Sequence, residues 1–241
     1  MSPPVLRQAV VERVAALDDH LVEVTCRADG PLAWEAGQWL SFKVADGGPR
    51  GKGIWRVYSL SSAAHESELF RTLVEIEAAG PGGKRFASLH EGDRLTWHGP
   101  YGKFVLRPRP AGRIVLAADG VGIGPVRAMI VSLARAGAPP APVTLVQQAA
   151  LHGAVPYENE FAALAAQTGG ALRYIVTRPD GLPPAERRPL PDLVPSLFPT
   201  PAVEATDWYL CGSGRCTDPL KGWLRASGVA SAAIRVERFF D

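Results

Sequence analysis

Three short stretches of the sequence carry residue types suited to binding phosphate-rich, aromatic ligands. The first is Arg56-Val57-Tyr58-Ser59, in a run whose residues alternate as in a half-buried strand. Alternation places Arg56, Tyr58 and Leu60 on one face of that strand. A guanidinium binds phosphate through paired, coplanar N–H donors, and a phenol ring can stack on a flat heterocycle. This face therefore suits a large anionic, aromatic ligand, although an ordinary surface strand can hold the same residues.

The other two stretches are glycine-rich turns between a strand and a helix. Gly120, Gly122 and Gly124 follow a buried-strand run and open a helical one. Such glycines let the backbone approach a pyrophosphate, and the helix start offers N–H donors. Further on, the run 210–214, Leu-Cys-Gly-Ser-Gly, repeats the pattern. Each turn predicts a ligand-facing edge of a sheet, and the alternative for each is a tight turn with no ligand.

The first half of the chain predicts short strands separated by turns. The strand-like runs are 10–17, 21–28, 39–44, 54–61, 69–77 and 93–98, with a short helical stretch at 84–89. This pattern is typical of an antiparallel β-barrel, here a six-stranded one.

The second half alternates strands with helices, which predicts an α/β domain with a parallel sheet. The strands are expected at 113–118, 143–148, 172–177, 208–211 and 234–237, and the helices at 125–136, 158–167 and 219–226. The proline-rich interval 178–206 is expected to be irregular, apart from a turn or two near 190–198. It is either a functional loop or a surface excursion. The stiff segment 107–112 predicts the link between a barrel domain at 1–108 and an α/β domain at 112–241.

Composition excludes several classes of function. The 26 Lys and Arg residues nearly balance 24 Asp and Glu, so no basic field for nucleic acid stands out. No apolar run has the length of a membrane span, and no secretion signal is visible, which predicts a cytoplasmic protein. The 3 cysteines and 5 histidines lack the spacing of a metal site. No arrangement typical of a serine or cysteine hydrolase is present.

The motifs occur in an order that resembles the ferredoxin-NADP reductase superfamily. The order is Arg-x-Tyr-Ser at 56–59, a glycine-rich turn at 80–83, Gly92-Asp93, the run 99–104, the turn at 118–125, Cys211-Gly212 and Glu237-Arg238-Phe239. The likeness runs over nearly the whole chain. It is strongest toward bacterial oxygenase reductases, without the iron-sulfur domain that those proteins often carry.

The resemblance implies which residues would hold FAD. Arg56 would bind the pyrophosphate, Tyr58 would stack on the isoalloxazine ring, and Ser59 would hydrogen-bond near flavin N5. The other implied flavin contacts are Val74, Gly82, Gly83, Lys84 and Phe239. Relatives usually have a serine near the double glycine, for which this chain offers Gly83 in one register or Ser88 in another. FMN is the alternative flavin. Phe239 and Phe240 would cover the second flavin face, or else complete the core.

The resemblance likewise implies a nicotinamide side. The residues expected to contact NADPH or NADH are Gly120, Gly122, Gly124, Pro125, Arg178, Cys211, Gly212 and Ser213. Ser59, Cys211 and Glu237 resemble the trio that flanks hydride transfer and aligns the two rings. Arg178, with Arg187 and Arg188, could meet a 2′-phosphate and slightly favours NADPH, although NADH users also have an arginine there.

Three departures from the family pattern leave a second function open. Asp119 replaces a glycine and should repel phosphate, the run 147–150 lacks the usual arginine, and Cys216 replaces a methionine. The main hypothesis is a flavin-dependent NAD(P)H oxidoreductase whose acceptor is a separate ferredoxin-like or oxygenase partner protein, or a small molecule. The alternative is a flavin-carrying electron-transfer or interaction subunit with weak or lost NAD(P)H turnover. A flavin-free barrel is the third reading.

Overall fold

The computed structural model describes residues 4–48, 51–64, 68–76, 80–110, 112–137, 139, 141–149, 155–178, 189–202 and 205–239. The chain divides into two compact units. The first contains Met1–Val105 and Arg127–Ser132, and the second contains Leu106–Val126 and Leu133–Asp241.

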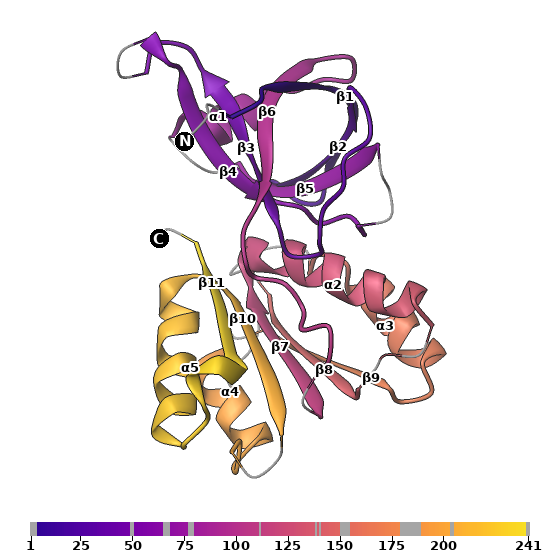
Figure 1. Ribbon diagram of the computed structural model, residues 1–241, viewed down its shortest axis with the longest axis vertical. Coiled ribbons are helices and arrows are strands. Elements are labelled where there is room, and N and C mark those ends of the chain that lie inside the picture. Colours follow the sequence, from indigo (N-terminus) through magenta and orange to yellow (C-terminus); the bar gives the residue numbers. More distant parts are fainter. Residues whose placement is uncertain are drawn as a thin grey trace. The chain divides into compact units, whose positions relative to one another are not determined.

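The first unit is a six-stranded antiparallel sheet that curls into a barrel (Figure 1). Its strands are β1 (Arg7–Ala16), β2 (Leu21–Ala28), β3 (Trp39–Ala45), β4 (Ile54–Ser59), β5 (Leu69–Glu75) and β6 (Arg94–Tyr101). They follow the order β4-β3-β6-β1-β2-β5. A bridge between Leu60 and Thr72 joins the ends of that order, and Ser61 N donates to Arg71 O at 2.8 Å. The predicted barrel is confirmed.

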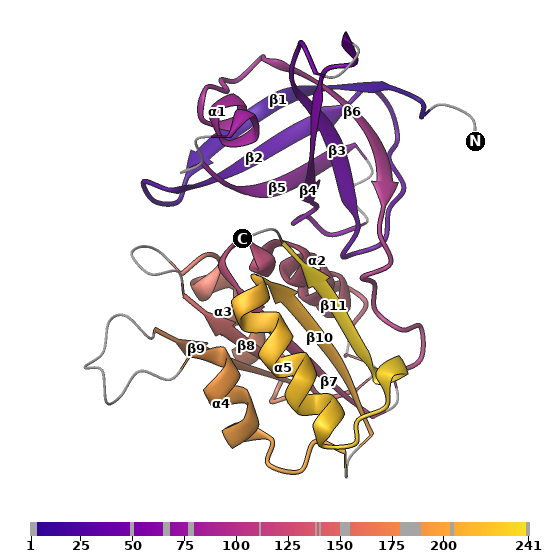
Figure 2. The ribbon, with the colours of Figure 1, turned by 90° about the vertical axis from the view of Figure 1, so that its left-hand side faces the viewer.

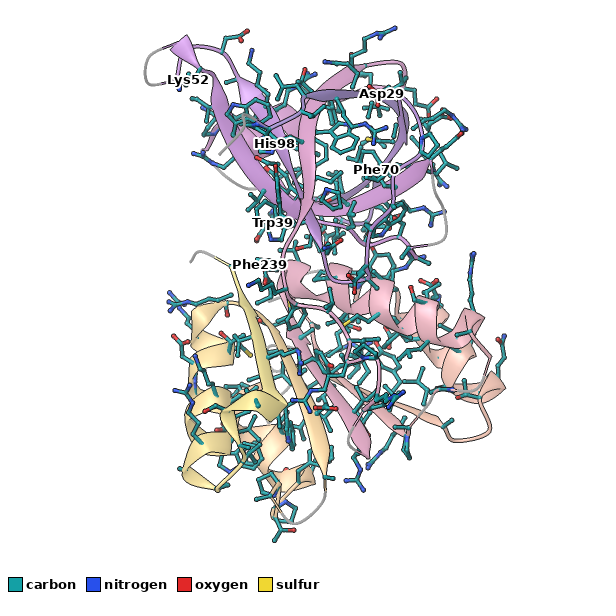
Figure 3. All side chains as sticks on the ribbon, viewed as in Figure 1. Asp29, Trp39, Lys52, Phe70, His98 and Phe239 are labelled. Carbon is teal, nitrogen blue, oxygen red and sulfur yellow. The ribbon has the colours of Figure 1, made fainter. Side chains whose placement is uncertain are left out.

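Alternating apolar residues fill the interior of the barrel. Phe42, Phe70 and Trp97 are fully buried there, and Figure 3 shows Phe70 within the ring of strands. The short helix α1 (Pro81–Ala87) adds Phe86 to the same core. Because strands place successive side chains on opposite faces, this pattern fixes which residues of β4 face inward.

The second unit is a parallel sheet with helices on both faces. Its strands are β7 (Arg113–Asp119), β8 (Val143–Gln148), β9 (Leu172–Thr177), β10 (Thr206–Gly212) and β11 (Ile234–Arg238), in the order β11-β10-β7-β8-β9. Its longer helices are α3 (Glu158–Gln167), α4 (Leu190–Leu197) and α5 (Gly214–Ala226), and α2 (Ile123–Arg135) follows β7, with Arg127–Ser132 counted in the first unit. Helices α4 and α5 cover one face, and α3 lies on the other (Figures 1 and 2). The predicted α/β fold is confirmed.

Three helices differ from the sequence prediction. The short helix α1 covers Pro81–Ala87 rather than 84–89. Residues 190–197 form the helix α4, whereas the proline-rich interval was expected to hold only a turn or two. Pro191 lies in the first turn, where a missing N–H costs little, and Leu190 and Val194 are buried in the core. Helix α5 begins at Gly214, directly after β10, rather than near Pro219. The rest of the proline-rich interval up to 188, with Glu77 at the predicted end of β5, lies outside the described residues.

Candidate functional site

Arg56, Tyr58 and Gly82 converge at one place on the barrel. A Cβ atom on Gly82 would overlap the Tyr58 hydroxyl and lie 3.3 Å from Arg56 Cγ. The predicted shared face of Arg56 and Tyr58 on β4 is therefore present, and it is turned toward α1. Glycine is required at 82 because the helix backbone lies directly against the phenol.

Tyr58 is held by aromatic neighbours. Its ring lies 4.4 Å from that of Phe86 and 6.0 Å from that of Phe42, measured between centroids. Burial raises the pKa of Tyr58 to about 12, with Arg56 acting in the opposite direction. The phenol is thus neutral at physiological pH, and its ring is fixed in place. Arg56 is exposed beside it and donates to Trp55 O at 2.8 Å.

The other predicted flavin residues of the first unit differ in their exposure and in the groups they contact. Gly83 is buried in α1 and Lys84 is exposed, whereas Ser88 follows the opposite end of the helix and donates to Arg85 O at 3.0 Å. Gly83 and Ser88 thus lie at different ends of α1, and the choice between the two registers stays open. The Val74 side chain is 1% exposed in the barrel core, so only its main chain could meet a cofactor. Ser59 ends β4, and its carbonyl accepts a hydrogen bond of 3.0 Å from Thr72 Oγ1.

The barrel also carries an aromatic group that the sequence did not single out. The rings of Trp55 and His98 are 4.7 Å apart, those of Trp39 and Tyr101 are 5.1 Å apart, and His98 Nδ1 lies 3.0 Å from Tyr101 Oη. Figure 3 marks Trp39 and His98 on this unit. Burial lowers the pKa of His98, so its imidazole is neutral at pH 7.

The two glycine turns of the second unit meet at the carboxyl ends of neighbouring strands. Strands β7 and β10 are adjacent, and the chain turns to opposite sides of the sheet from them. Open parallel sheets bind ligands at such a switch point. A Cβ on Gly122 would lie 2.5 Å from Cys211 O, so this glycine lets the turns pack together. Gly120 has a φ of +52° and open space beside it, and it is the glycine best placed for a ligand.

Gly124 and Pro125 lie in the first turn of α2, and both are buried. Nitrogen atoms in a first helical turn have no partner within the helix, which suits an anion nearby. The predicted glycine turn is therefore a strand-to-helix connection, as the motif requires.

Cys211 and Glu237 are register partners on the parallel strands β10 and β11. Burial, followed by the charges of Glu237 and Asp119, raises the pKa of the Cys211 thiol well above its usual value. Burial also raises the pKa of the Glu237 carboxyl. The protonated thiol can donate a hydrogen bond beside a ligand and is not a nucleophile, and the Glu237 carboxyl adds a second polar group next to it. Ser59, the third member of the predicted trio, belongs to the first unit.

Asp119 is engaged with the second glycine turn. Its Oδ1 accepts from Ser213 N at 2.9 Å and its Oδ2 from Ser213 Oγ at 2.6 Å. A Cβ on Gly212 would lie 2.7 Å from Asp119 Cγ, so glycine is required there. The sequence predicted repulsion between this carboxylate and phosphate. The structure shows that this carboxylate also ties the two turns together, and the repulsion stays a prediction.

The residues around the missing arginine are also engaged. Gln147 is 1% exposed, donates to Pro156 O at 3.1 Å and accepts from Tyr174 Oη at 2.7 Å. Gln148 Oε1 accepts from Leu190 N at 2.8 Å. Arg178, exposed after β9, forms an ion pair with Glu158. Arg187, Arg188 and Ala150 lie outside the described residues.

Phe239 follows β11 and is half-buried (Figure 3). Its N–H donates to Gly212 O at 2.9 Å, which ties it to the Cys211-Gly212 turn. Phe240 lies outside the described residues. Cys216, at the position of the family's methionine, is buried in the core of the second unit.

Phe86, Thr72 and Glu158 are the neighbours of this site that the sequence did not point to. Phe86 could have been found from its apolar side chain three residues after the double glycine. The described residues contain no group of His, Cys, Asp or Glu that could hold a metal ion. In the described part of the chain, no helix has both the length and the apolarity needed to cross a membrane.

Comparison with known proteins agrees with this geometry. Residues 21–106 match the oxidoreductase FAD-binding domain. Ferredoxin-NADP reductase B of Sorangium cellulosum is 29% identical over 221 residues, which cover 88% of each chain. The toluate 1,2-dioxygenase electron transfer component of Pseudomonas putida is 25% identical, with 96% of this chain and 67% of that protein covered.

A solved structure has a similar fold over nearly the whole of this chain. The cytochrome P450 reductase GcoB of Amycolatopsis superposes with a TM-score of 0.82 and 26% identity, covering 99% of this chain and 71% of that one. The flavin-side geometry, the parallel sheet with its two glycine turns and these relatives agree. The chain is an oxidoreductase with an FAD-binding domain, it is similar to ferredoxin-NADP reductases over most of its length, and NAD(P)H fits as its electron donor.

Proposed function

We propose that the protein passes electrons from NAD(P)H through FAD to a separate acceptor, either a ferredoxin-like protein or an oxygenase component. A small-molecule acceptor such as oxygen, a quinone or a free flavin is the remaining possibility. Relatives named as electron transfer components of oxygenases support the protein acceptor. The observation that carries the proposal is the convergence of Arg56, Tyr58 and Gly82 on one face of the barrel.

In this proposal the first unit holds FAD. The exposed Arg56 guanidinium binds the pyrophosphate through paired charged hydrogen bonds, and Lys84 adds a positive charge. The neutral ring of Tyr58, fixed against Phe86, offers a flat surface for the isoalloxazine. Gly82 and Gly83 keep the helix backbone close, and the main chain of Val74 and the side chain of Phe239 complete the contacts. When bound, FAD accepts hydride and releases electrons one or two at a time.

The second unit orients NAD(P)H. Gly120, Gly122, Gly124 and Pro125 surround the pyrophosphate, and Cys211, Gly212 and Ser213 lie beside the nicotinamide. The Cys211 thiol keeps its proton, since burial raises its pKa, and it holds the ring by a hydrogen bond. Glu237, its neighbour on β11, and Ser59 supply the remaining polar groups. Alignment of this kind contributes to hydride transfer by holding the reacting atoms at short distance.

Anaerobic reduction tests the proposal. Excess NADH and NADPH are added separately to the purified yellow protein, and the flavin absorbance is followed. Bleaching by at least one donor is expected. Subsequent oxidation by a ferredoxin or an oxygenase component, compared with oxidation by oxygen or a quinone, identifies the class of acceptor.

The second candidate is a flavin-carrying subunit that has lost NAD(P)H turnover, and Asp119 motivates it. The two hydrogen bonds from Ser213 hold that carboxylate against the second glycine turn and favour its ionised form, so its charge is retained. An Asp119→Gly variant decides between the two. A flavin that stays oxidised in the original protein but is reduced in this variant, together with co-purification of a partner, would establish the second candidate, whereas reduction in the original protein would reject it.

A further inference from the structure

We infer that the protein is selective for NADH over NADPH, and that Glu158 is the specificity-determining residue because it holds Arg178. This inference rests on the proposed function and names the donor at the same site. It reverses the slight preference for NADPH that Arg178 suggested in the sequence.

The sheet order places Arg178 at the adenosine end of the nucleotide. The proposed nicotinamide residues, Cys211 and Glu237, lie on β10 and β11. A dinucleotide that crosses the switch point between β10 and β7 extends its other half over the carboxyl ends of β8 and β9. Gln148 ends β8, and Arg178 directly follows β9. The adenosine 2′ position is what separates NADPH from NADH, and an arginine at this edge is the natural partner for its phosphate.

Arg178 is already paired. Its Nη2 lies 2.5 Å from Glu158 Oε1 and 2.6 Å from Glu158 Oε2, so both carboxylate oxygens accept from the same nitrogen. The two side chains are 48% and 39% exposed. This partly open edge is accessible to a nucleotide, and the charge of the arginine is compensated there.

The position of Glu158 is fixed by helix α3 and the residues that anchor it. It is the first residue of α3, and its predecessor Tyr157 adopts a left-handed conformation with a φ of 64°. Gln147 fixes the approach to this helix by donating to Pro156 O at 3.1 Å. Phe161, fully buried, anchors the helix against Tyr174 with ring centroids 5.4 Å apart. Gln147, in the run that lacks the family's arginine, therefore helps to set the carboxylate opposite Arg178.

NADPH and NADH differ in the charge that they bring to the Arg178–Glu158 pair. A 2′-phosphate carries about two negative charges at neutral pH, so it must displace Glu158 from Arg178 and then lie near the released carboxylate. Gln147 and Gln148, at the end of β8, are neutral amides engaged elsewhere. The 2′-hydroxyl of NADH is neutral and carries none of these costs. The pair therefore disfavours NADPH and leaves NADH unaffected.

The binding of NAD⁺ and NADP⁺, which do not reduce the flavin, tests the proposed selectivity for NADH. Titration calorimetry on the FAD-loaded protein should give a Kd for NAD⁺ lower than that for NADP⁺ by about tenfold or more, as expected for a contested charged hydrogen bond. In Glu158→Gln the Kd for NADP⁺ should fall by about tenfold, with NAD⁺ changed less than about twofold. In the double variant Glu158→Gln, Arg178→Ala that gain should vanish, because it requires the released guanidinium.

Glu160→Gln is the matched control. Glu160 lies in the same first turn of α3, so this variant changes the net charge equally without touching the Arg178 pair, and neither Kd should move. Retained flavin and an unchanged melting temperature show that each variant is folded. Arg178→Ala alone should leave NADP⁺ binding weak, which gives a second readout if Glu158→Gln folds poorly.

Several outcomes would overturn the inference. Tighter binding of NADP⁺ by the original protein, or no shift in Glu158→Gln, would refute the role of Glu158. If both NADH and NADPH reduced the flavin with equal efficiency, selectivity would be wrong while the proposed function stood. Failure of either donor to bind or to reduce the flavin would reject the proposed function and the inference with it.

Discussion

The ionisation of Glu237 links the chemistry of the site to stability. Burial raises its pKa above 4.5, so the folded protein keeps this proton at a pH where the unfolded chain has lost it. The stability contributed by this group is complete below about pH 4.5 and is lost as the pH rises through the raised folded value. Glu237→Gln carries no such titration.

We therefore expect the melting temperature of the original protein, relative to Glu237→Gln, to be highest near pH 4 and to be lower once the pH exceeds 4.5, as measured by thermal melts at about one-unit steps. The exposed Glu91→Gln variant is the comparison, and its difference from the original protein should be flat by contrast. A difference that grows with pH for Glu237→Gln would contradict the buried, proton-retaining carboxyl.

At the scale of single residues, the sequence predicted which residues carry the chemistry better than it predicted which residues they contact. Arg56, Tyr58 and the glycine at 82 carry their chemistry in their side chains and spacing, and the structure brings them together. The Asp119 carboxylate was predicted to repel phosphate because of its charge, and its hydrogen bonds with Ser213 were not foreseen because that residue lies 94 positions away. Only the pairing of β7 with β10 makes that contact, and strand order cannot be read from local pattern.

The first turn of α1 is where a helix and a strand must fit most closely. Alanine favours helix over glycine, so Gly82→Ala should stabilise an isolated helix. In this protein the added methyl overlaps the Tyr58 hydroxyl, and we expect a loss of about 1–3 kcal/mol of stability together with weaker FAD binding. Thermal melts and FAD titration of the apoprotein measure the two effects.

Gly222→Ala in α5 is the matched comparison, because a Cβ there meets nothing within 4 Å. It should gain about 0.5–1 kcal/mol through the same helix preference, with FAD binding unchanged. If both substitutions stabilised the protein, the close approach of α1 to Tyr58 would be wrong.

At the scale of elements, periodicity predicted the strands well. The bounds of β8, α3 and β9 agree with the expected ranges, because apolar strands and an amphipathic helix have clear periods. Helix α4 was missed, since its prolines suggest a loop and its stability comes from burying Leu190 and Val194 against the sheet. Tertiary burial of this kind overrides local preference, which no short window reveals.

At the scale of the whole chain, an ion pair with the buried Asp207 lies where the chain enters the second unit. The second unit begins at Leu106, and Arg107 Nη1 lies 3.1 Å from Asp207 Oδ1, a side chain with no exposure. Arg107 N is also 2.9 Å from Tyr209 Oη. These contacts anchor the entering segment to β10, so the link predicted from its prolines is held on one side by side chains the sequence did not identify.

Asp207→Asn should therefore lower the free energy of unfolding by about 2 kcal/mol, since it removes the charge that compensates Arg107 in a buried place. Urea denaturation followed by tryptophan fluorescence measures the change. Arg109→Ala, in the exposed part of the same segment, is the control and should stay within about 0.5 kcal/mol of the original protein. An equal loss for both would show that the anchor contributes nothing specific.

The hydrogen bond from Thr72 to the carbonyl of Ser59 has a practical consequence for redesign of this protein. The Thr72 side chain is fully buried, so its hydrogen bond holds the end of β4, the strand that carries Arg56 and Tyr58, from the interior of the barrel. Libraries aimed at a new electron acceptor can vary the outward Val57, which is 50% exposed, while the inward threonine is kept constant. Changing the interior instead would alter the placement of Ser59 in every member of such a library.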